Sequence, residues 1–212
     1  MKIAIISANL GNFEKHIDWV EQKVEGADVS VHRFDDKTFP PRKRTMHPRL
    51  QARIVKMFGW EMAPGHDYYL WVDSSRALLR PDALAWFFEK GKDKDLVLFK
   101  HPQRNTIKEE ADFIKSKLSH KYLDLRYAGE LIDEQLKAIP DTYVDNKLYA
   151  STAFFYKDSQ KVRSFLTAWW VHTSRYHAVD QLALPYLVWN HNCSVHELDE
   201  DVYNCEYIPV VR

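Results

Sequence analysis

The chain has 212 residues, of which 45% are hydrophobic and 28% charged, the size and composition of one globular domain covering residues 1–212. Thirty Lys and Arg residues balance thirty Asp and Glu residues, so there is no net charge to attract nucleic acid or an anionic membrane. The apolar run at residues 3–6 is shorter than a signal-peptide core, and no run approaches the roughly 20 apolar residues of a membrane span. We therefore expect a soluble, cytoplasmic protein with no nucleic-acid partner and no membrane span.

The first hundred residues alternate between strand and helix patterns. Residues 2–7 form a nearly continuous apolar run, typical of a strand buried on both faces. Residues 13–24 carry apolar side chains at spacings of four, three and four, which predicts a helix. The same reasoning predicts strands at residues 29–34, 68–72 and 96–99 and helices at residues 48–58 and 82–88.

The second half is richer in helix patterns. Residues 106–139 are highly charged and helix-compatible, and we expect two or three helices that lie over the sheet. Further patterns predict strands at residues 148–156 and 194–198 and helices at residues 159–171 and 179–189. The order of these elements indicates an α/β fold, Rossmann-like, with a mostly parallel central sheet flanked by helices.

Polar residues stand where the predicted strands end, and in such sheets a ligand binds beyond the carboxyl ends of the strands. Asp73, Ser74 and Ser75 follow the third strand directly. A carboxylate at this place can hold a divalent cation that bridges a diphosphate. The alternative is that Asp73 or Ser74 only caps a turn. The other strand ends carry Ser7, Ala8, Asn9, Asp35 and His101.

A basic cluster precedes the third strand. Residues 40–44 form a proline-stiffened basic loop, and Arg49, Arg53 and Lys56 follow at spacings of four and three. This spacing places three cations on one helix face, which suits a phosphate or diphosphate. The alternative is a solvated helix face. The sequence has neither a Walker A motif nor G-x-G-x-x-G, so ATPase and nicotinamide interpretations lose their main support.

Two further motifs lie near the end of the chain. Asp180 precedes an apolar helical stretch and can act as a general base if its pocket is partly dry, with His177 as a weaker candidate. The alternative for Asp180 is a first-turn acid that interacts with the helix dipole. His191 and His196 flank a short strand, and either can supply a neutral imidazole ligand or be a hydrogen-bonded structural histidine.

Several segments in this order resemble the nucleotide-sugar glycosyltransferases of the GT-A fold. In particular they are similar to a glycosyltransferase-like domain family of plants and bacteria linked to pectin and mucilage synthesis. The matching segments are Ser-Ala-Asn-Leu-Gly-Asn-Phe at residues 7–13, the helix at 48–59, Leu-Trp-Val-Asp at 70–73, Lys-His-Pro-Gln-Arg at 100–104, Glu-Glu-Ala at 109–111 and Asp-Gln-Leu-Ala-Leu at 180–184. Their order and approximate spacing hold over nearly the whole chain.

The resemblance implies a role for each matched position. Residues 1–101 would form the nucleotide-sugar-binding half and residues 102–212 the acceptor-side half. Asp180 would be the catalytic base, and Asp73, Ser75 and His196 would hold Mn²⁺ or Mg²⁺. The acceptor would contact His101, Arg104 and Gln181. The donor would contact Ser7, Ala8, Asn9, Arg44, Arg49, Arg53, Asp73, Ser74 and Ser75.

One position departs from the family pattern. The D-x-D motif of the family would place a second aspartate where this chain has Ser75. Serine is a poorer metal ligand than a carboxylate, so metal binding would be weaker, would depend on His196, or would be replaced by the arginines.

The resemblance implies a hexosyl- or pentosyltransferase that moves a sugar from a nucleoside diphosphate, with UDP favoured, to a hydroxyl of a glycan or glycoconjugate. Inversion and retention both stay open. One alternative is a non-catalytic nucleotide-sugar or glycan-binding module of the same fold. The other is a sugar nucleotidyltransferase, although the sequence has no Gly-rich, Lys-containing loop after the first strand.

Overall fold

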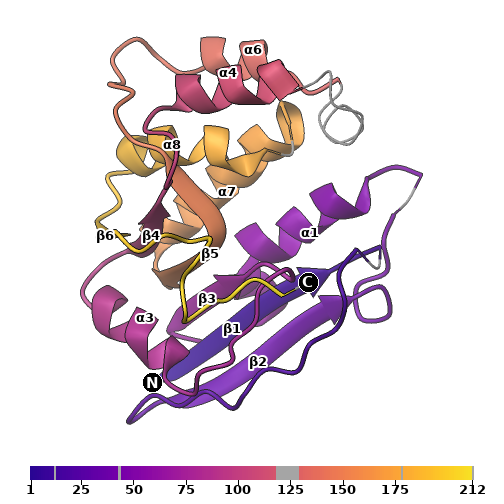
Figure 1. Cartoon of the computed structure of the whole chain (residues 1–212), viewed down its shortest axis with the longest axis vertical. Helices are drawn as coiled ribbons and strands as arrows, with labels where there is room; N and C mark the ends of the chain where they lie inside the picture. Colours follow the sequence, from indigo (N-terminus) through magenta and orange to yellow (C-terminus); the bar gives the residue numbers. More distant parts are fainter. Residues whose placement is uncertain (12, 43, 118–128, 178, 212) are drawn as a thin grey trace.

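A six-stranded sheet in the order β2-β1-β3-β5-β4-β6 forms the centre of the computed structural model (Figure 1). The structure describes residues 1–11, 13–42, 44–117, 129–177 and 179–211. β5 is antiparallel to both of its neighbours, whereas the other pairs are parallel. The mostly parallel sheet is therefore confirmed. Its strands are β1 (Lys2–Asn9), β2 (Asp28–Asp35), β3 (Tyr68–Val72), β4 (Leu96–Lys100), β5 (Tyr149–Lys157) and β6 (Val195–Leu198).

The antiparallel strand β5 joins the two halves of the chain into one sheet. It comes from the second half and lies between β3 and β4 of the first half. At the carboxyl ends of these two strands, the Asp73 amide donates to the Thr152 carbonyl at 2.8 Å and the His101 amide donates to the Leu148 carbonyl at 2.9 Å. Asp73 and His101 therefore lie at the same edge of the sheet. The functional division near residue 101 stays a prediction.

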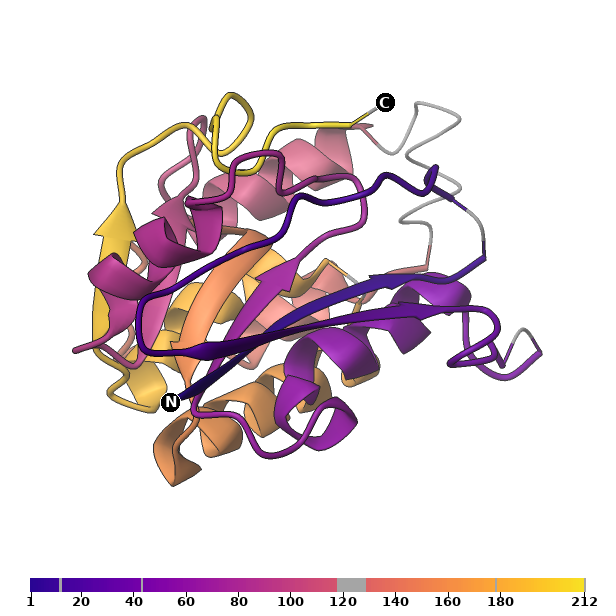
Figure 2. The same cartoon turned by 90° about the horizontal axis from the view of Figure 1, so that it is seen from below.

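Helices cover both faces of the sheet (Figures 1 and 2). α1, α7 and α8 pack on one face, in a core that includes Val55 and Trp169. α3 and the C-terminal segment pack on the other face, in a core that includes Phe87 and Ile208. The helices are α1 (Pro48–Met57), α2 (Gly59–Met62), α3 (Ala83–Gly91), α4 (Ile107–Lys117), α6 (Ile132–Lys137), α7 (Gln160–Arg175) and α8 (Leu184–Asn190), with a 3-10 turn η1 (Asp180–Leu182).

The flanked α/β architecture agrees with the sequence analysis. Within residues 106–139, α4 and α6 account for two of the expected helices, while residues 118–128 lie outside the described residues. The helix predicted at residues 179–189 begins instead as the turn η1 and continues as α8. Among the described helices, none combines the length and the apolar character that crossing a membrane would require.

The prediction of a helix at residues 13–24 is wrong. This segment has no regular secondary structure, and Phe13 and Val20 are 56% and 42% exposed, so the apolar stripe does not form one buried face. Its backbone bonds to a distant loop instead: the Val20 amide donates to the Leu78 carbonyl at 2.9 Å. The Gln22 side chain also donates to the Arg80 carbonyl and accepts from the Leu84 amide. These long-range bonds replace the internal bonds of a helix.

Gly59 permits a close contact between α2 and the sheet. A Cβ atom at this position would lie 2.5 Å from Ile6 Cδ1 and 2.6 Å from the Tyr156 hydroxyl. Both neighbours are buried, so neither has room to move. We expect Gly59→Ala to lower the free energy of unfolding by about 1–3 kcal/mol, the usual cost of overpacking. Urea denaturation measures this loss, and an unchanged midpoint would contradict the tight packing.

Candidate functional site

The start of α1 is fixed by local bonds, which sets the direction of its basic face. Pro48 occupies the first turn, and Nδ1 of His47 accepts from the Arg49 amide at 3.1 Å. The Gln51 side chain accepts from the Arg42 amide at 2.6 Å and donates to the Pro40 carbonyl at 2.9 Å. The helix and the loop before it are therefore held together, next to the carboxyl ends of β1 and β3.

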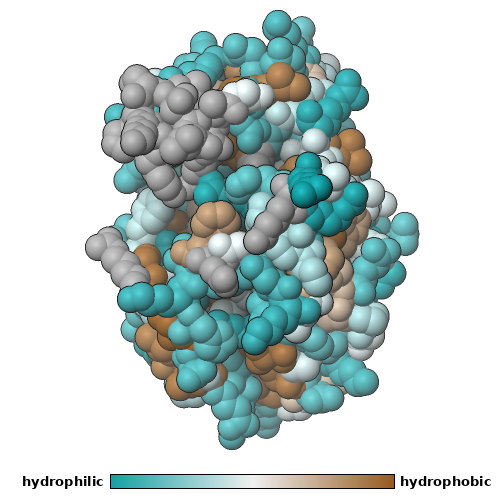
Figure 3. Space-filling view, turned by 90° about the vertical axis from the view of Figure 1, so that its right-hand side faces the viewer, coloured by the Kyte–Doolittle hydropathy of each residue, from teal (hydrophilic) through white to brown (hydrophobic). Residues whose placement is uncertain are grey.

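A cavity of about 220 Å³, here called the strand-end cavity, lies at this place. The side of the molecule that carries α1 is mostly hydrophilic, with hydrophobic patches between the polar side chains (Figure 3). The residues that line the cavity come from the end of β1, from α1 and from the end of β3. They are Ala8, Asn9, Leu10, Phe13, Glu14, Arg49, Ala52, Arg53, Trp71, Asp73, Ser74 and Ser75.

This set contains seven of the nine residues predicted to contact a donor. The two exceptions are Ser7, which is buried within the sheet at 2% exposure, and Arg44, which lies exposed in the loop before α1. Its neighbour Lys43 lies outside the described residues. The structure therefore gathers most of the predicted donor residues around one cavity.

Asp180 lies beside this cavity in a buried cluster of charges. Its Oδ2 accepts a hydrogen bond from Lys56 Nζ at 2.7 Å and lies 3.1 Å from Arg53 Nε. Its Oδ1 accepts from the Ser151 hydroxyl at 2.8 Å. Burial raises the pKa of Asp180, but the charges of Arg53 and Lys56 and these hydrogen bonds outweigh burial and lower it to about 2.

These surroundings are unfavourable for the predicted general-base role of Asp180. A general base works best when its pKa lies near the operating pH, whereas this carboxylate is a weak base whose two oxygens already have partners. The alternative candidate His177 is also buried, and burial lowers its pKa to about 4. Asp180 is instead placed to hold the side chains of Arg53 and Lys56 in their orientations.

Lys56 is the central cation of this cluster, and the prediction of site residues omitted it. Its side chain is fully buried, so a solvated helix face is the wrong interpretation for this residue. The ammonium lies 5.7 Å and 5.5 Å from the ring centroids of Trp71 and Trp169, within the range of cation–π attraction. Burial lowers the pKa of Lys56, an effect opposed by Asp180 and Asp73.

Asp73 connects the buried cluster to the cavity. Its Oδ1 accepts from the Trp71 indole at 2.7 Å and lies 3.8 Å from Lys56 Nζ. Arg76 is buried nearby, where burial lowers its pKa and the charge of Asp73 opposes that effect. The side chain of Asp73 therefore takes part in a charged network. Its carbonyl also accepts from the Arg76 amide at 2.9 Å across the turn at Ser74 and Ser75, so the turn alternative holds for its backbone.

The predicted metal ligands are not brought together. Asp73 and Ser75 line the strand-end cavity, but His196 lies on β6 and lines another cavity with Trp86 and Tyr207. β3 and β6 are separated by β5 and β4, and three strand spacings of about 4.8 Å amount to roughly 14 Å. The prediction that His196 joins Asp73 is therefore wrong.

The remaining side chains do not fit a metal site built by the protein alone. One carboxylate with two hydroxyls is a poor donor set for Mg²⁺ or Mn²⁺, and one oxygen of Asp73 already accepts from Trp71. Within the described parts of the chain, no group of three or more His, Cys, Asp or Glu side chains is placed to hold a metal ion.

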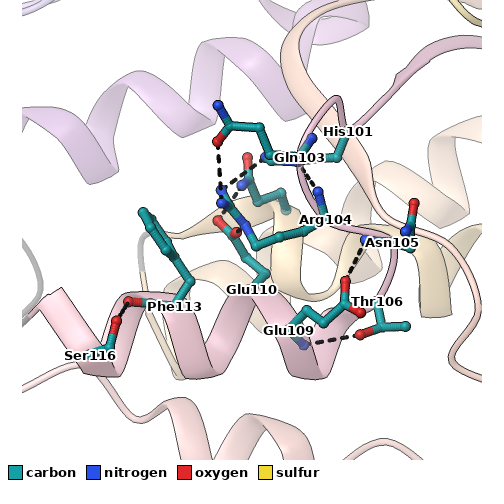
Figure 4. Close-up of polar contacts among 10 residues, drawn as sticks. His101, Gln103, Arg104, Asn105, Thr106, Glu109, Glu110, Phe113 and Ser116 are labelled. Atoms are coloured by element: carbon teal, nitrogen blue, oxygen red, sulfur yellow. Dashed lines mark hydrogen bonds and ion pairs between the residues drawn. The ribbon is translucent and has the colours of Figure 1, made fainter.

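The predicted acceptor residues do come together, around a residue that the site prediction omitted. Glu110 on α4 pairs with Nε of Arg104 (Figure 4) and accepts from Gln181 Nε2 at 2.5 Å. Arg104 Nη2 lies 3.2 Å from His101 Nε2, and the guanidinium lies 4.0 Å from the ring centroid of Phe113. We call His101, Arg104, Glu110 and Gln181 the Glu110 cluster.

The fold brings the Glu110 cluster beside the buried charges of Asp180, Arg53 and Lys56. Gln181 directly follows Asp180, and His101 and Asp73 lie at the same edge of the sheet. α4 is held in place by Asp145, whose carboxylate accepts from the amides of Ile107 and Lys108 at 2.8 and 3.0 Å. The two groups of polar side chains are therefore linked through the backbone between Asp180 and Gln181.

A larger cavity of about 540 Å³ lies near α8 and the edge strand β6. Tyr143, Tyr149, Trp189 and Glu197 are among its lining residues. None of the residues predicted for donor, acceptor, metal or catalysis lines it within the described part of the chain.

No family model matches the sequence, and no curated protein matches it. Among solved structures, the chain is similar to a glycosyltransferase involved in the glycosylation of the major capsid of PBCV-1. The identity is 10% and the TM-score 0.48, over 95% of this chain and 82% of that chain. At these values the likeness carries no weight, and the fold described above depends on the strand order and directions alone.

Proposed function

We propose that the chain is a glycosyltransferase that moves a sugar from a nucleoside diphosphate donor to a hydroxyl of a glycan or glycoconjugate. One observation carries this proposal: Arg49 and Arg53 line the same small cavity as Asp73, at the carboxyl ends of β1 and β3. Ligands of α/β sheets bind at such ends, and guanidinium groups are well suited to phosphate oxygens. The resemblance found in the sequence makes UDP the favoured nucleotide.

The proposed chemistry assigns separate tasks to the residues of the site. Arg49 and Arg53 bind the diphosphate and stabilise the negative charge that grows on it as the bond to the sugar breaks. Ser74, Ser75 and Asn9 supply hydroxyl and amide groups for hydrogen bonds to the donor. Asp180 is a positioning residue that keeps Arg53 and Lys56 in place.

Turnover tests this proposal directly. The chain is incubated with UDP-, GDP- and dTDP-sugars and a panel of glycan acceptors, and release of the nucleoside diphosphate is measured together with the transferred sugar. We expect one donor to be consumed and its sugar to appear on an acceptor. The absence of both binding and release for every donor would overturn the proposal.

The second candidate is a nucleotide-sugar-binding module without catalysis. It is favoured by the low pKa of Asp180 and by the bonds that engage both of its oxygens, because these leave the predicted base unsuited to its task. Binding of a donor with no release of its nucleoside diphosphate, with every acceptor, would support this candidate.

The Glu110 cluster provides a test of the acceptor side. Replacing Glu110 with glutamine leaves the half-buried Arg104 without its counter-charge, and charge-assisted hydrogen bonds are worth about 1.5–3 kcal/mol. We expect Glu110→Gln to raise the acceptor KM about 10-fold and to leave the donor KM unchanged. Steady-state transfer kinetics measure both constants.

The neighbouring residue Glu109 offers a matched control. It is exposed and bonds to the Asn105 amide rather than to Arg104. Glu109→Gln should therefore keep both KM values. An equal rise in acceptor KM for the two variants would remove the Glu110 cluster from the proposed acceptor site.

A further inference from the structure

Asp73, at the strand-end cavity, and Asp180, beside it, already have cation partners within the chain. Lys56 Nζ lies 2.7 Å from Asp180 and 3.8 Å from Asp73. Arg53 Nε lies 3.1 Å from the same oxygen of Asp180. Because the Lys56 side chain is fully buried, its ammonium cannot move into solvent without local unfolding, and Lys56 is a fixed counter-ion for both acids.

The charged groups at the cavity balance one another before any ligand binds. Arg49 and Arg53 line the cavity together with Glu14 and Asp73. Behind them, Lys56 lies against Asp180 and Asp73, and the charges of Asp73 and Asp201 stabilise the charged form of Arg76.

This arrangement disfavours a divalent cation and favours an anion. A metal ion at Asp73 would meet a carboxylate that already faces Lys56 at 3.8 Å and whose Oδ1 already accepts from Trp71. A diphosphate brings its own negative charge and meets the two arginines that line the cavity. Opposite charges attract strongly at such short distances in a partly buried site.

Given the proposed function, we infer that the site binds the diphosphate of its donor directly through the cations of the chain, with Lys56 in place of a bound metal ion as the counter-charge of Asp73. The serine at position 75 is consistent with this inference: a second carboxylate there would add negative charge beside the diphosphate and would supply the second acid of D-x-D for a metal ion. The structure therefore accounts for the departure from D-x-D as part of a different way to balance charge.

Titration calorimetry of the full chain with UDP tests the inference. The dissociation constant is measured in EDTA, in Mg²⁺ and in Mn²⁺, and GDP, dTDP and CMP are titrated in the same way. We expect one nucleoside diphosphate to bind with the same dissociation constant, within about twofold, in all three conditions. Loss or tenfold weakening of binding in EDTA would overturn the inference and leave the proposed transferase intact. No binding of any nucleotide in any condition would overturn both.

A single substitution tests the charge balance itself. Ser75→Asp adds the second carboxylate, and we expect UDP to bind about tenfold more weakly in EDTA, with recovery in Mn²⁺ as the two acids accept a metal ion. Ser75→Asn adds similar bulk without charge. This variant should bind UDP with the same dissociation constant in EDTA as in Mn²⁺. The bond from the Val211 amide to the Ser75 carbonyl involves only backbone atoms and can persist in both variants. Equal, undiminished binding by Ser75→Asp in EDTA and Mn²⁺ would contradict the charge-balance argument.

Discussion

Replacing Asp180 with alanine is expected to lower the free energy of unfolding by about 3–5 kcal/mol, the usual cost of breaking a buried ion pair. The variant leaves Lys56 fully buried without its closest carboxylate, and it removes the partner of the Ser151 hydroxyl. For a chain of this size, each kcal/mol shifts the melting temperature by about 2–4 °C. We therefore expect a decrease of about 10 °C in a thermal melt.

The control is an exposed aspartate in an ion pair of similar length. Asp199 lies 2.6 Å from Lys100, and its side chain is 82% exposed. Because solvent screens such pairs, the melting temperature of Asp199→Ala should be close to that of the unmodified chain. If Asp180→Ala melts as the control does, Asp180 is not the centre of a buried charge cluster.

The pH dependence of stability provides an independent test of the same cluster. The pKa of Asp180 is about 2 in the folded chain against an ordinary value of 3.8, so the folded state favours the charged form. The charged form of Asp180 therefore contributes about 2 kcal/mol to the free energy of unfolding. This stabilisation is present above about pH 3.8 and is lost as the pH falls toward 2. The stability difference between the unmodified chain and Asp180→Asn should shrink by that amount between pH 5 and pH 2 in urea denaturation. A difference that stays constant would contradict the lowered pKa.

Replacing Arg53 with glutamine is expected to weaken nucleoside diphosphate binding about 10- to 100-fold, since one charge-assisted hydrogen bond to phosphate is worth about 1.5–3 kcal/mol. The variant keeps a polar side chain at the cavity, and Asp180 keeps Lys56 and Ser151 as partners. The fold should therefore persist. Calorimetry with UDP measures the change, and circular dichroism checks that the variant is folded.

An arginine outside the cavity separates a local effect from a change in net charge. Arg80 pairs with Asp82 and Glu206 next to α3 and is not among the described residues that line the strand-end cavity. Arg80→Gln removes the same charge and should leave UDP affinity unchanged. Equal weakening by both substitutions would assign the effect to overall charge and return the basic face of α1 to a structural role.

The strands and the location of the cavity could be predicted because their signals are local. Continuous apolar runs such as Ile3 to Ile6 belong to strands buried on both faces, and the rule for strand ends placed a polar site beyond Asn9 and Asp73. The spacing of Arg49, Arg53 and Lys56 likewise predicted one shared helix face. These inferences required no knowledge of distant contacts.

The wrong predictions concern segments whose structure depends on contacts with residues far away in the chain. Residues 13–24 have helical spacing, but bonds to the loop around Leu78 hold them in an irregular path. Asp180 has the position of a first-turn acid, yet its role depends on Lys56, which is 124 residues away in the chain. No local pattern reveals such a partner, and none showed that two strands separate His196 from Asp73.

Glu110 lies between these two cases. It belongs to an acidic pair that opens a helix, which is a common helix-start pattern and gives no sign of function. Its contacts with Arg104 and Gln181 join a loop after β4, the start of α4 and the turn η1. Only the folded chain shows that two of the predicted acceptor residues, Arg104 and Gln181, share this one carboxylate.

A crystal structure of the chain with UDP bound would test the central claim most directly. The account predicts that the diphosphate lies in the strand-end cavity, with its oxygens within hydrogen-bond distance of Arg49 or Arg53. Density for the nucleotide in the larger cavity near α8, or anywhere else away from these arginines, would contradict the proposed donor site.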